Sequence, residues 1–144
     1  NMKMELTISK YTPGMRPDIT IPSSKMFDLL GEQGIRELVN NHYDLLKVSA
    51  VKHLFPQDET GLKKAKEHSS DFFIQICGGP MYFSKKRGKP QLYKRHLPHK
   101  ITAEARVEWL NCYKTELKKL NLPDDVLKSF WNYLDAFSMW MVNS

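Results

Sequence analysis

The sequence has no apolar run long enough to span a bilayer, and its N-terminal residues include polar residues and prolines where a signal peptide would have its apolar segment. It therefore predicts a cytoplasmic protein with no membrane attachment. Cysteine is scarce, because Cys77 and Cys112 are too few for a disulfide framework and lack the paired spacing of a zinc site. Both are expected to be buried, reduced thiols.

Internal repeats, low-complexity tracts and convincing strand patterns are also absent. A chain of 144 residues can bury one sizeable core, and 41% hydrophobic with 26% charged residues is typical of a globular protein. Aromatic residues make up 11%, which suits either a core of large side chains or a pocket for a flat apolar ligand.

The formal net charge of +6 is compatible with nucleic acid, anionic lipid or an acidic ligand as a partner. A nucleic-acid partner is not favoured, because the chain contains no recognised nucleic-acid motif. Most of the lysines are expected to be solvated. The cationic cluster between residues 85 and 100 surrounds His96, however, and can neutralise an acidic group on a ligand held there.

The spacing of apolar residues and the turn residues predict an all-α protein with an extended arm at residues 1–22 and one domain at 23–144. Gly31 ends the first short helix, Gly78-Gly79-Pro80 stops a later one, and Pro123 opens the last. Residues 81–100 are otherwise expected to be loop. The helices are predicted at about residues 25–30, 35–48, 62–76, 91–96, 102–120 and 123–141.

His96 is the best candidate for a ligand residue. It lies in a short segment between Pro90 and Pro98 that separates two long helices, so the movement of its ring is restricted. We interpret this segment as a ligand site, because a neutral imidazole can act as a ligand.

Six motifs of this chain occur together in a pattern typical of one known family. They are Tyr43, Phe55-Pro56, Gly78-Gly79-Pro80, Arg87-Gly88-x-Pro90-x-Leu92, Arg95-His96-x-Pro98 and Arg106-x-x-Trp109-Leu110-x-Cys112. With these motifs the chain resembles the truncated haemoglobins, and among them the second group, over residues 26–142. The resemblance implies a globin-like, truncated two-over-two helical sandwich around haem b, with His96 as the proximal iron ligand. A neutral imidazole is a normal axial ligand of haem iron, which agrees with that role.

The same resemblance implies roles for the other pocket residues. Tyr43 and Trp109 are hydrogen-bond donors to a bound diatomic ligand, and Arg95 suits a haem propionate. The family often has Tyr at the position of Phe83, whereas here Tyr is at 82. Further candidates are Ala65 and Ser69 at distal positions and Phe55, Phe72, Phe73, Ile76, Leu92 and Tyr82 against the cofactor.

Two helix registers compete at the distal side. The stripe through Ala65, Ser69 and Phe72 favours Ser69 as pocket lining, whereas a small shift would turn His68 inward. His68 could then donate to the ligand or coordinate iron itself.

Three function classes follow. The first is reversible binding and transport of dioxygen, with NO and CO as other ligands. The second is redox chemistry at the same haem, either nitric oxide dioxygenase or peroxidase-like turnover, which needs a separate reductase because the chain contains no flavin or nicotinamide motif. The third, a haem-free module that binds polyanions, lacks a supporting motif.

Overall fold

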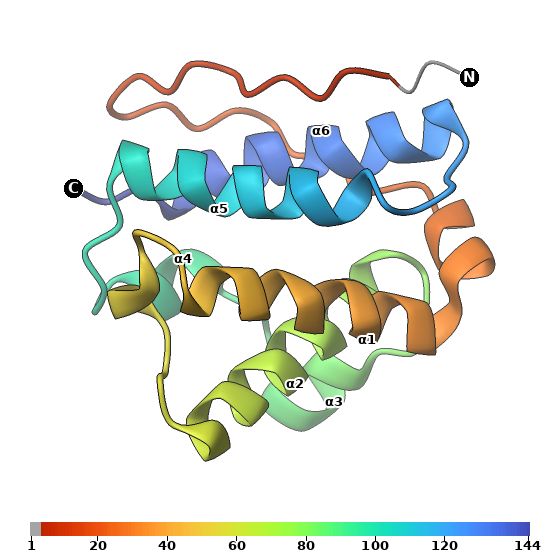
Figure 1. Cartoon of the computed structure of the whole chain (residues 1–144), viewed down its shortest axis with the longest axis horizontal. Helices are drawn as coiled ribbons and strands as arrows, with labels where there is room; N and C mark the ends of the chain where they lie inside the picture. The colour runs from red at the N-terminus through yellow and green to blue at the C-terminus, as the bar shows by residue number, and fades with distance from the viewer. Residues whose placement is uncertain (1–3) are drawn as a thin grey trace. The chain divides into compact units, whose positions relative to one another are not determined.

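The computed structural model describes residues 4–144, and within them every regular element is a helix (Figure 1). The all-α class is therefore confirmed, since the described residues contain no strand. No helix in this part of the chain is both long and apolar enough to cross a membrane. The chain divides into two compact units, residues 23–90 and residues 4–22 with 91–144, and each is described by itself.

The unit of residues 23–90 begins with α1, Lys25–Lys47, which bends at Gly31. Gly31 has φ 66° and ψ −180°, a conformation that glycine reaches more easily than other residues because it lacks a Cβ atom. The sequence predicted that a first short helix ends at Gly31. The structure confirms a break there, although the segments on both sides of it belong to the single element α1. A 3₁₀ turn, Lys52–Leu54, follows α1.

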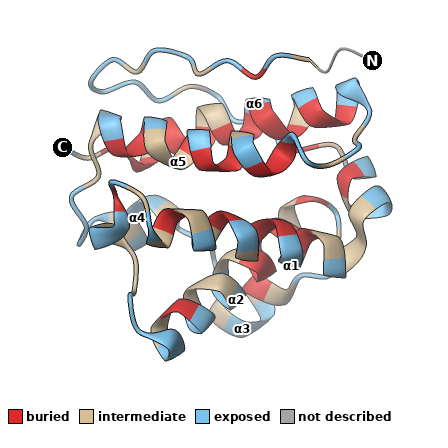
Figure 2. Ribbon diagram, in the orientation of Figure 1, coloured by how far each residue is buried: buried red, intermediate tan, exposed pale blue. Residues whose placement is uncertain are grey.

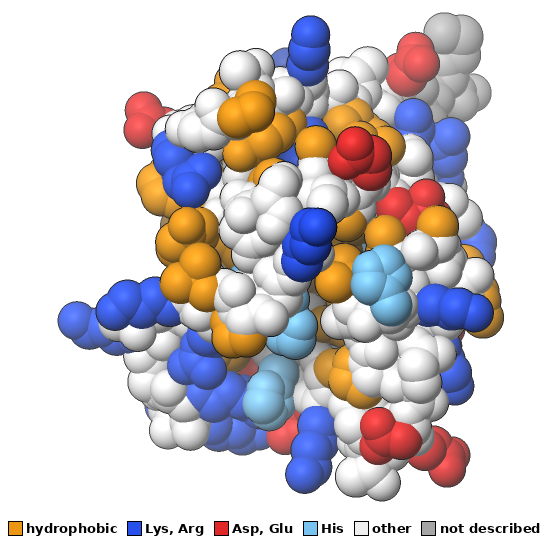
Figure 3. Space-filling view, turned by 90° about the vertical axis from the view of Figure 1, so that its left-hand side faces the viewer, with side chains coloured by type: hydrophobic (Ala, Val, Ile, Leu, Met, Phe, Trp, Pro, Cys, Tyr) orange, Lys and Arg blue, Asp and Glu red, His pale blue; other side chains and the backbone are white. Residues whose placement is uncertain are grey.

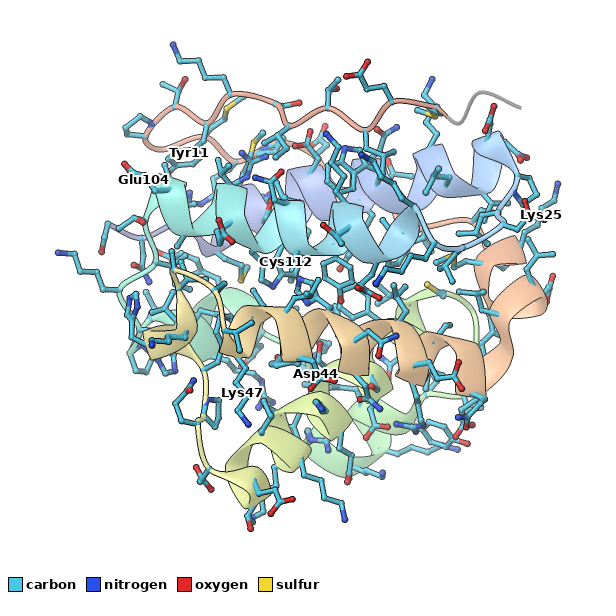
Figure 4. The ribbon with its side chains drawn as sticks, viewed as in Figure 1. Tyr11, Lys25, Asp44, Lys47, Glu104 and Cys112 are labelled. Atoms are coloured by element: carbon cyan, nitrogen blue, oxygen red, sulfur yellow. The ribbon has the colours of Figure 1, made fainter. Side chains whose placement is uncertain are left out.

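The second long helix of this unit is α2, Glu59–Ile76, which begins earlier than predicted. The Asp58 carboxylate accepts a hydrogen bond of 2.8 Å from the Gly61 amide and so caps the helix. Gly78, with φ 96°, follows the end of α2 and confirms the predicted stop. An ion pair of 2.7 Å joins Lys66 of α2 to Asp44, which is labelled on α1 in Figure 4.

A third helix, α3, spans Tyr82–Arg87, where the sequence predicted loop, so that prediction was wrong. Its stability comes from contacts with α2. Phe83 is buried with its ring 5.8 Å from the ring of Phe72, and the Ser84 amide donates 2.9 Å to the Gln75 side-chain oxygen. Neither contact is visible as a local signal in a segment rich in lysine.

The other unit contains α4, Leu92–His96, α5, Ala103–Leu117, and α6, Asp124–Met141, all close to the predicted positions. Thr102 caps α5 by accepting 3.0 Å from the Ala105 amide. Buried and exposed positions alternate along α5 and α6 (Figure 2), as expected for helices with one apolar face. In α5 the inward position is Arg106 rather than Val107, which is 40% exposed.

The arm of residues 4–22 has no regular helix or strand and runs along α6 (Figure 1). Two indole groups of α6 donate to its backbone. Trp131 Nε1 lies 2.7 Å from the Thr7 carbonyl oxygen, and Trp140 Nε1 lies 2.8 Å from that of Pro17. These bonds hold the arm at two points ten residues apart, one on each side of its turn at Gly14.

Candidate functional site

His96 is the last residue of α4, and its ring is held by its own helix. The Nδ1 atom lies 2.7 Å from the Leu92 carbonyl oxygen. Because a carbonyl oxygen only accepts, Nδ1 carries the hydrogen and Nε2 keeps its lone pair. Burial lowers the pKa of His96 and nearby His99 acts in the same direction, while the bond to Leu92 opposes them. The ring is therefore a neutral imidazole at pH 7 whose Nε2 can act as a ligand.

Three other predicted site residues lie in the same unit as His96. Arg95 is exposed and Leu92 is half-buried, both on α4. Trp109, on α5, is half-buried with its ring 4.9 Å from that of Tyr113 and 6.2 Å from that of Phe137. The indole thus contacts two other aromatic rings.

In the unit of residues 23–90, the structure brings together Tyr43, Phe55 and Ser69. The Tyr43 and Phe55 rings meet edge to face at 5.6 Å. Burial raises the pKa of the Tyr43 phenol, and a side-chain hydrogen bond with Ser69 partly offsets the rise. Tyr43 is therefore a protonated donor at neutral pH, linked to Ser69 of α2.

The predicted residues of α2 differ in exposure. Phe72 and Phe73 are buried, and the centres of their rings are 5.5 Å apart. Ala65, Ser69 and Ile76 are half-buried. His68 is exposed. Since it is Ser69 that bonds to Tyr43, the contacts of α2 favour the register in which Ser69 faces inward.

The hydroxyl of Tyr82, predicted to lie near the cofactor, donates 2.9 Å to the Glu32 carboxylate of α1. This bond raises the pKa of the Tyr82 phenol. Sequence reasoning did not identify Glu32, because its pairing depends on how α3 approaches α1. The only signals in the sequence for this pairing were the acidic residue Glu32 itself and the tyrosine at position 82 instead of at the position of Phe83, where the family often has one.

A second missed cluster surrounds Asp71, whose side chain is fully buried. Its carboxylate accepts 2.9 Å from Arg36, 2.9 Å from Arg87 and 3.3 Å from Lys86. Burial by itself raises the pKa of Asp71, but these three cations outweigh burial and lower it. The cluster joins α1, α2 and α3. A charged residue inside an apolar stretch of α2 was the signal that could have revealed it.

On the face shown in Figure 3, the positive side chains lie at several separate places and do not form one patch. Some of them are committed to the Asp71 cluster, so the net charge overstates the free positive surface. Within residues 4–144, no group of three or more His, Cys, Asp or Glu side chains is arranged to hold a metal ion. Both cysteines are buried and free.

A sequence model of the family described as bacterial-like globin matches residues 25–143. The chain belongs to this family. Globins bind haem and, through it, oxygen or another small ligand, so this chain is a haem-dependent binder of small ligands. The truncated-haemoglobin family inferred from the motifs around His96 is thereby confirmed.

Curated and solved relatives agree with this assignment. The group 2 truncated hemoglobin YjbI of Bacillus subtilis is 29% identical over 118 residues, which cover 81% of this globin and 87% of the relative. The phosphate-bound Hell's gate globin IV has a TM-score of 0.87 at 35% identity, covering 96% of this chain and 86% of that one. The truncated oxygen-avid haemoglobin from Bacillus subtilis has a TM-score of 0.75 at 29% identity, covering 81% and 98%. The truncated globin fold class is therefore confirmed.

Proposed function

We propose that this globin binds haem b with Nε2 of His96 as the proximal ligand and that it binds dioxygen reversibly. The observation that carries the proposal is the bond of 2.7 Å between His96 Nδ1 and the Leu92 carbonyl oxygen. That bond selects the tautomer in which Nε2 is an electron-pair donor and restrains rotation of the ring. One such nitrogen is what haem iron requires from the protein on its proximal side.

Haem, when bound, supplies an iron atom that takes O₂, NO or CO. The chain supplies donors for such a ligand. Tyr43 keeps its proton because burial raises its pKa, and its bond with Ser69 orients the hydroxyl. The Trp109 indole N–H is a donor at every pH. Each hydrogen bond contributes about 0.5 to 1.5 kcal/mol, so the two together slow ligand escape by about ten- to a hundredfold.

The remaining candidate residues suit the walls and edges of a porphyrin site. Phe72 and Phe73 provide buried apolar surface, and Phe55, Ile76 and Leu92 provide half-buried surface. The small side chain of Ala65 leaves room for a ligand. Arg95 is exposed, as expected for a group that pairs with a propionate at the edge of the haem.

The decisive experiment is the visible spectrum of the purified protein and of two matched variants. Wild-type protein should show a Soret band and a five-coordinate ferrous spectrum. His96→Gly should lose haem, or bind it stably only with added imidazole, because free imidazole can fill the space left by the deleted side chain. His99→Gly removes an exposed histidine three residues away and should behave like wild type. An unchanged ferrous spectrum in His96→Gly would exclude His96 as the proximal ligand.

A further inference from the structure

The helix that carries His96 cannot hold its own position. α4 has five residues, and none of them is buried. A helix this short is unstable in isolation because its nucleation cost is not recovered. Its position must therefore be set by contacts with other parts of its unit.

The first contact comes from Asn143, two residues after α6. Its side-chain Nδ2 donates 2.7 Å to the His99 carbonyl oxygen and 3.3 Å to the His96 carbonyl oxygen. Its Oδ1 accepts 2.9 Å from the Ile101 amide, and its own amide donates 3.0 Å to the Ile101 carbonyl oxygen. One amide side chain thus holds residues 96–101 through both donor and acceptor groups.

The second contact comes from the N-terminal arm. The Arg16 guanidinium lies 5.1 Å from the centre of the Tyr93 ring, on α4, and 5.6 Å from that of the Trp140 ring, on α6. Trp140 in turn donates to the Pro17 carbonyl oxygen at 2.8 Å. Tyr93 and Trp140 each lie three residues before His96 and Asn143, so the arm joins the same two segments that Asn143 joins.

Asn143 and Leu92 bond to the two groups that determine where the imidazole points. The backbone carbonyl of His96 is held by Asn143, and its ring nitrogen is held by Leu92. Displacing the carbonyl end of residue 96 changes the angle at which the ring leaves α4.

We propose that Asn143 is a positioning residue for His96, and that Arg16 of the arm supports it through its contacts with Tyr93 and Trp140. The proposal rests on His96 being the proximal ligand. It assigns to the end of α6 and to the arm, which precedes the matched globin region, a part in setting the strength of the bond between iron and His96.

The test uses Asn143→Asp in the full-length holoprotein. The carboxylate retains the acceptor for the Ile101 amide but removes both donors and places negative charge beside two carbonyl oxygens. The matched control is Asn132→Asp, which makes the same charge change at an exposed position of α6. Two measurements are needed: the iron–histidine stretching band in resonance Raman spectra of the ferrous protein, and hydrogen exchange of the amides of residues 96–101.

Asn143→Asp should shift or broaden the iron–histidine band and accelerate amide exchange about tenfold, since losing a hydrogen bond of this kind costs on the order of 1.4 kcal/mol, a factor of ten. Arg16→Gln should change the band in the same direction by less. Asn132→Asp should match wild type in both measurements.

Three results separate the two proposals. Unchanged band and exchange in Asn143→Asp overturn the positioning role. Faster exchange with an unchanged band also overturns it, because Asn143 then stabilises the segment without orienting the ring. If the wild-type iron–histidine band survives in His96→Gly, the proposed ligand is wrong, whatever the Asn143 variants show.

Discussion

Arg106 of α5 and Asp135 of α6 form an ion pair of 2.7 Å in which the arginine side chain is only 1% exposed. The same guanidinium donates 2.8 Å to the Ser138 hydroxyl and 2.8 Å to the Ser9 carbonyl oxygen of the arm. Burial lowers the pKa of Arg106, whereas Asp135 opposes the shift. One buried cation thus joins two helices and the arm.

Arg106→Met should loosen the arm and destabilise the fold by about 3 kcal/mol, since the half-buried Asp135 carboxylate loses its cation and keeps only the hydrogen bonds from Ser9. The measurement is chemical unfolding together with chymotrypsin cleavage at Tyr11, which should become faster. Lys128→Met removes an exposed positive charge from α6 and serves as the control. Equal cleavage rates in the two variants would show that Arg106 does not anchor the arm.

Asp71→Asn should remove a pH-dependent part of the stability. The lowered pKa of Asp71 means that its carboxylate stabilises the folded state above the ordinary aspartate pKa of about 3.9. This stabilisation is lost as the pH falls through the lower pKa of the folded protein. At pH 7 the substitution should cost about 3 kcal/mol because two arginines lose their buried partner.

Unfolding curves from pH 7 down to about pH 2 test this prediction, with Asp44→Asn as the control. Asp44 pairs with Lys66 at the surface, so its loss should cost less than about 1 kcal/mol. If the wild type and Asp71→Asn lose stability in parallel on acidification, then the Asp71 carboxylate does not provide the pH-dependent stability.

Tyr43→Phe and Trp109→Phe should each accelerate dissociation of dioxygen several-fold, because each removes one hydrogen-bond donor while keeping an aromatic ring. The double variant should deviate from additivity if both donors serve the same ligand. Stopped-flow displacement of dioxygen by carbon monoxide measures these rates. Wild-type rates in both single variants would eliminate the donor roles.

Ser69→Ala should alter dioxygen dissociation or the carbon monoxide stretching frequency, because it frees the Tyr43 hydroxyl from its partner. His68→Ala should leave both unchanged, since His68 is exposed. A ferrous spectrum that changes from six- to five-coordinate in His68→Ala, with no effect of Ser69→Ala, would favour the opposite register.

Several features follow from local signals in the sequence. Gly31 breaks α1 and Gly78 follows the end of α2, as predicted, and Thr102 caps α5 close to its predicted start. Each of these depends on backbone geometry or on a hydrogen bond within three residues, and such effects are encoded locally. The motifs that indicated the family are spread from Tyr43 to Cys112, but each of them is short enough to be recognised within its own segment.

The sequence by itself therefore determined the helices with clear caps and stops, the globin family and the ligand candidate His96. Only the tertiary structure decided that residues 82–87 are helical, that Tyr82 donates to Glu32 and that Asn143 holds His96. These contacts join residues 47 to 50 positions apart. Their partners are chosen by which helix faces meet when the chain folds, and that choice depends on packing across the unit and not on any local pattern.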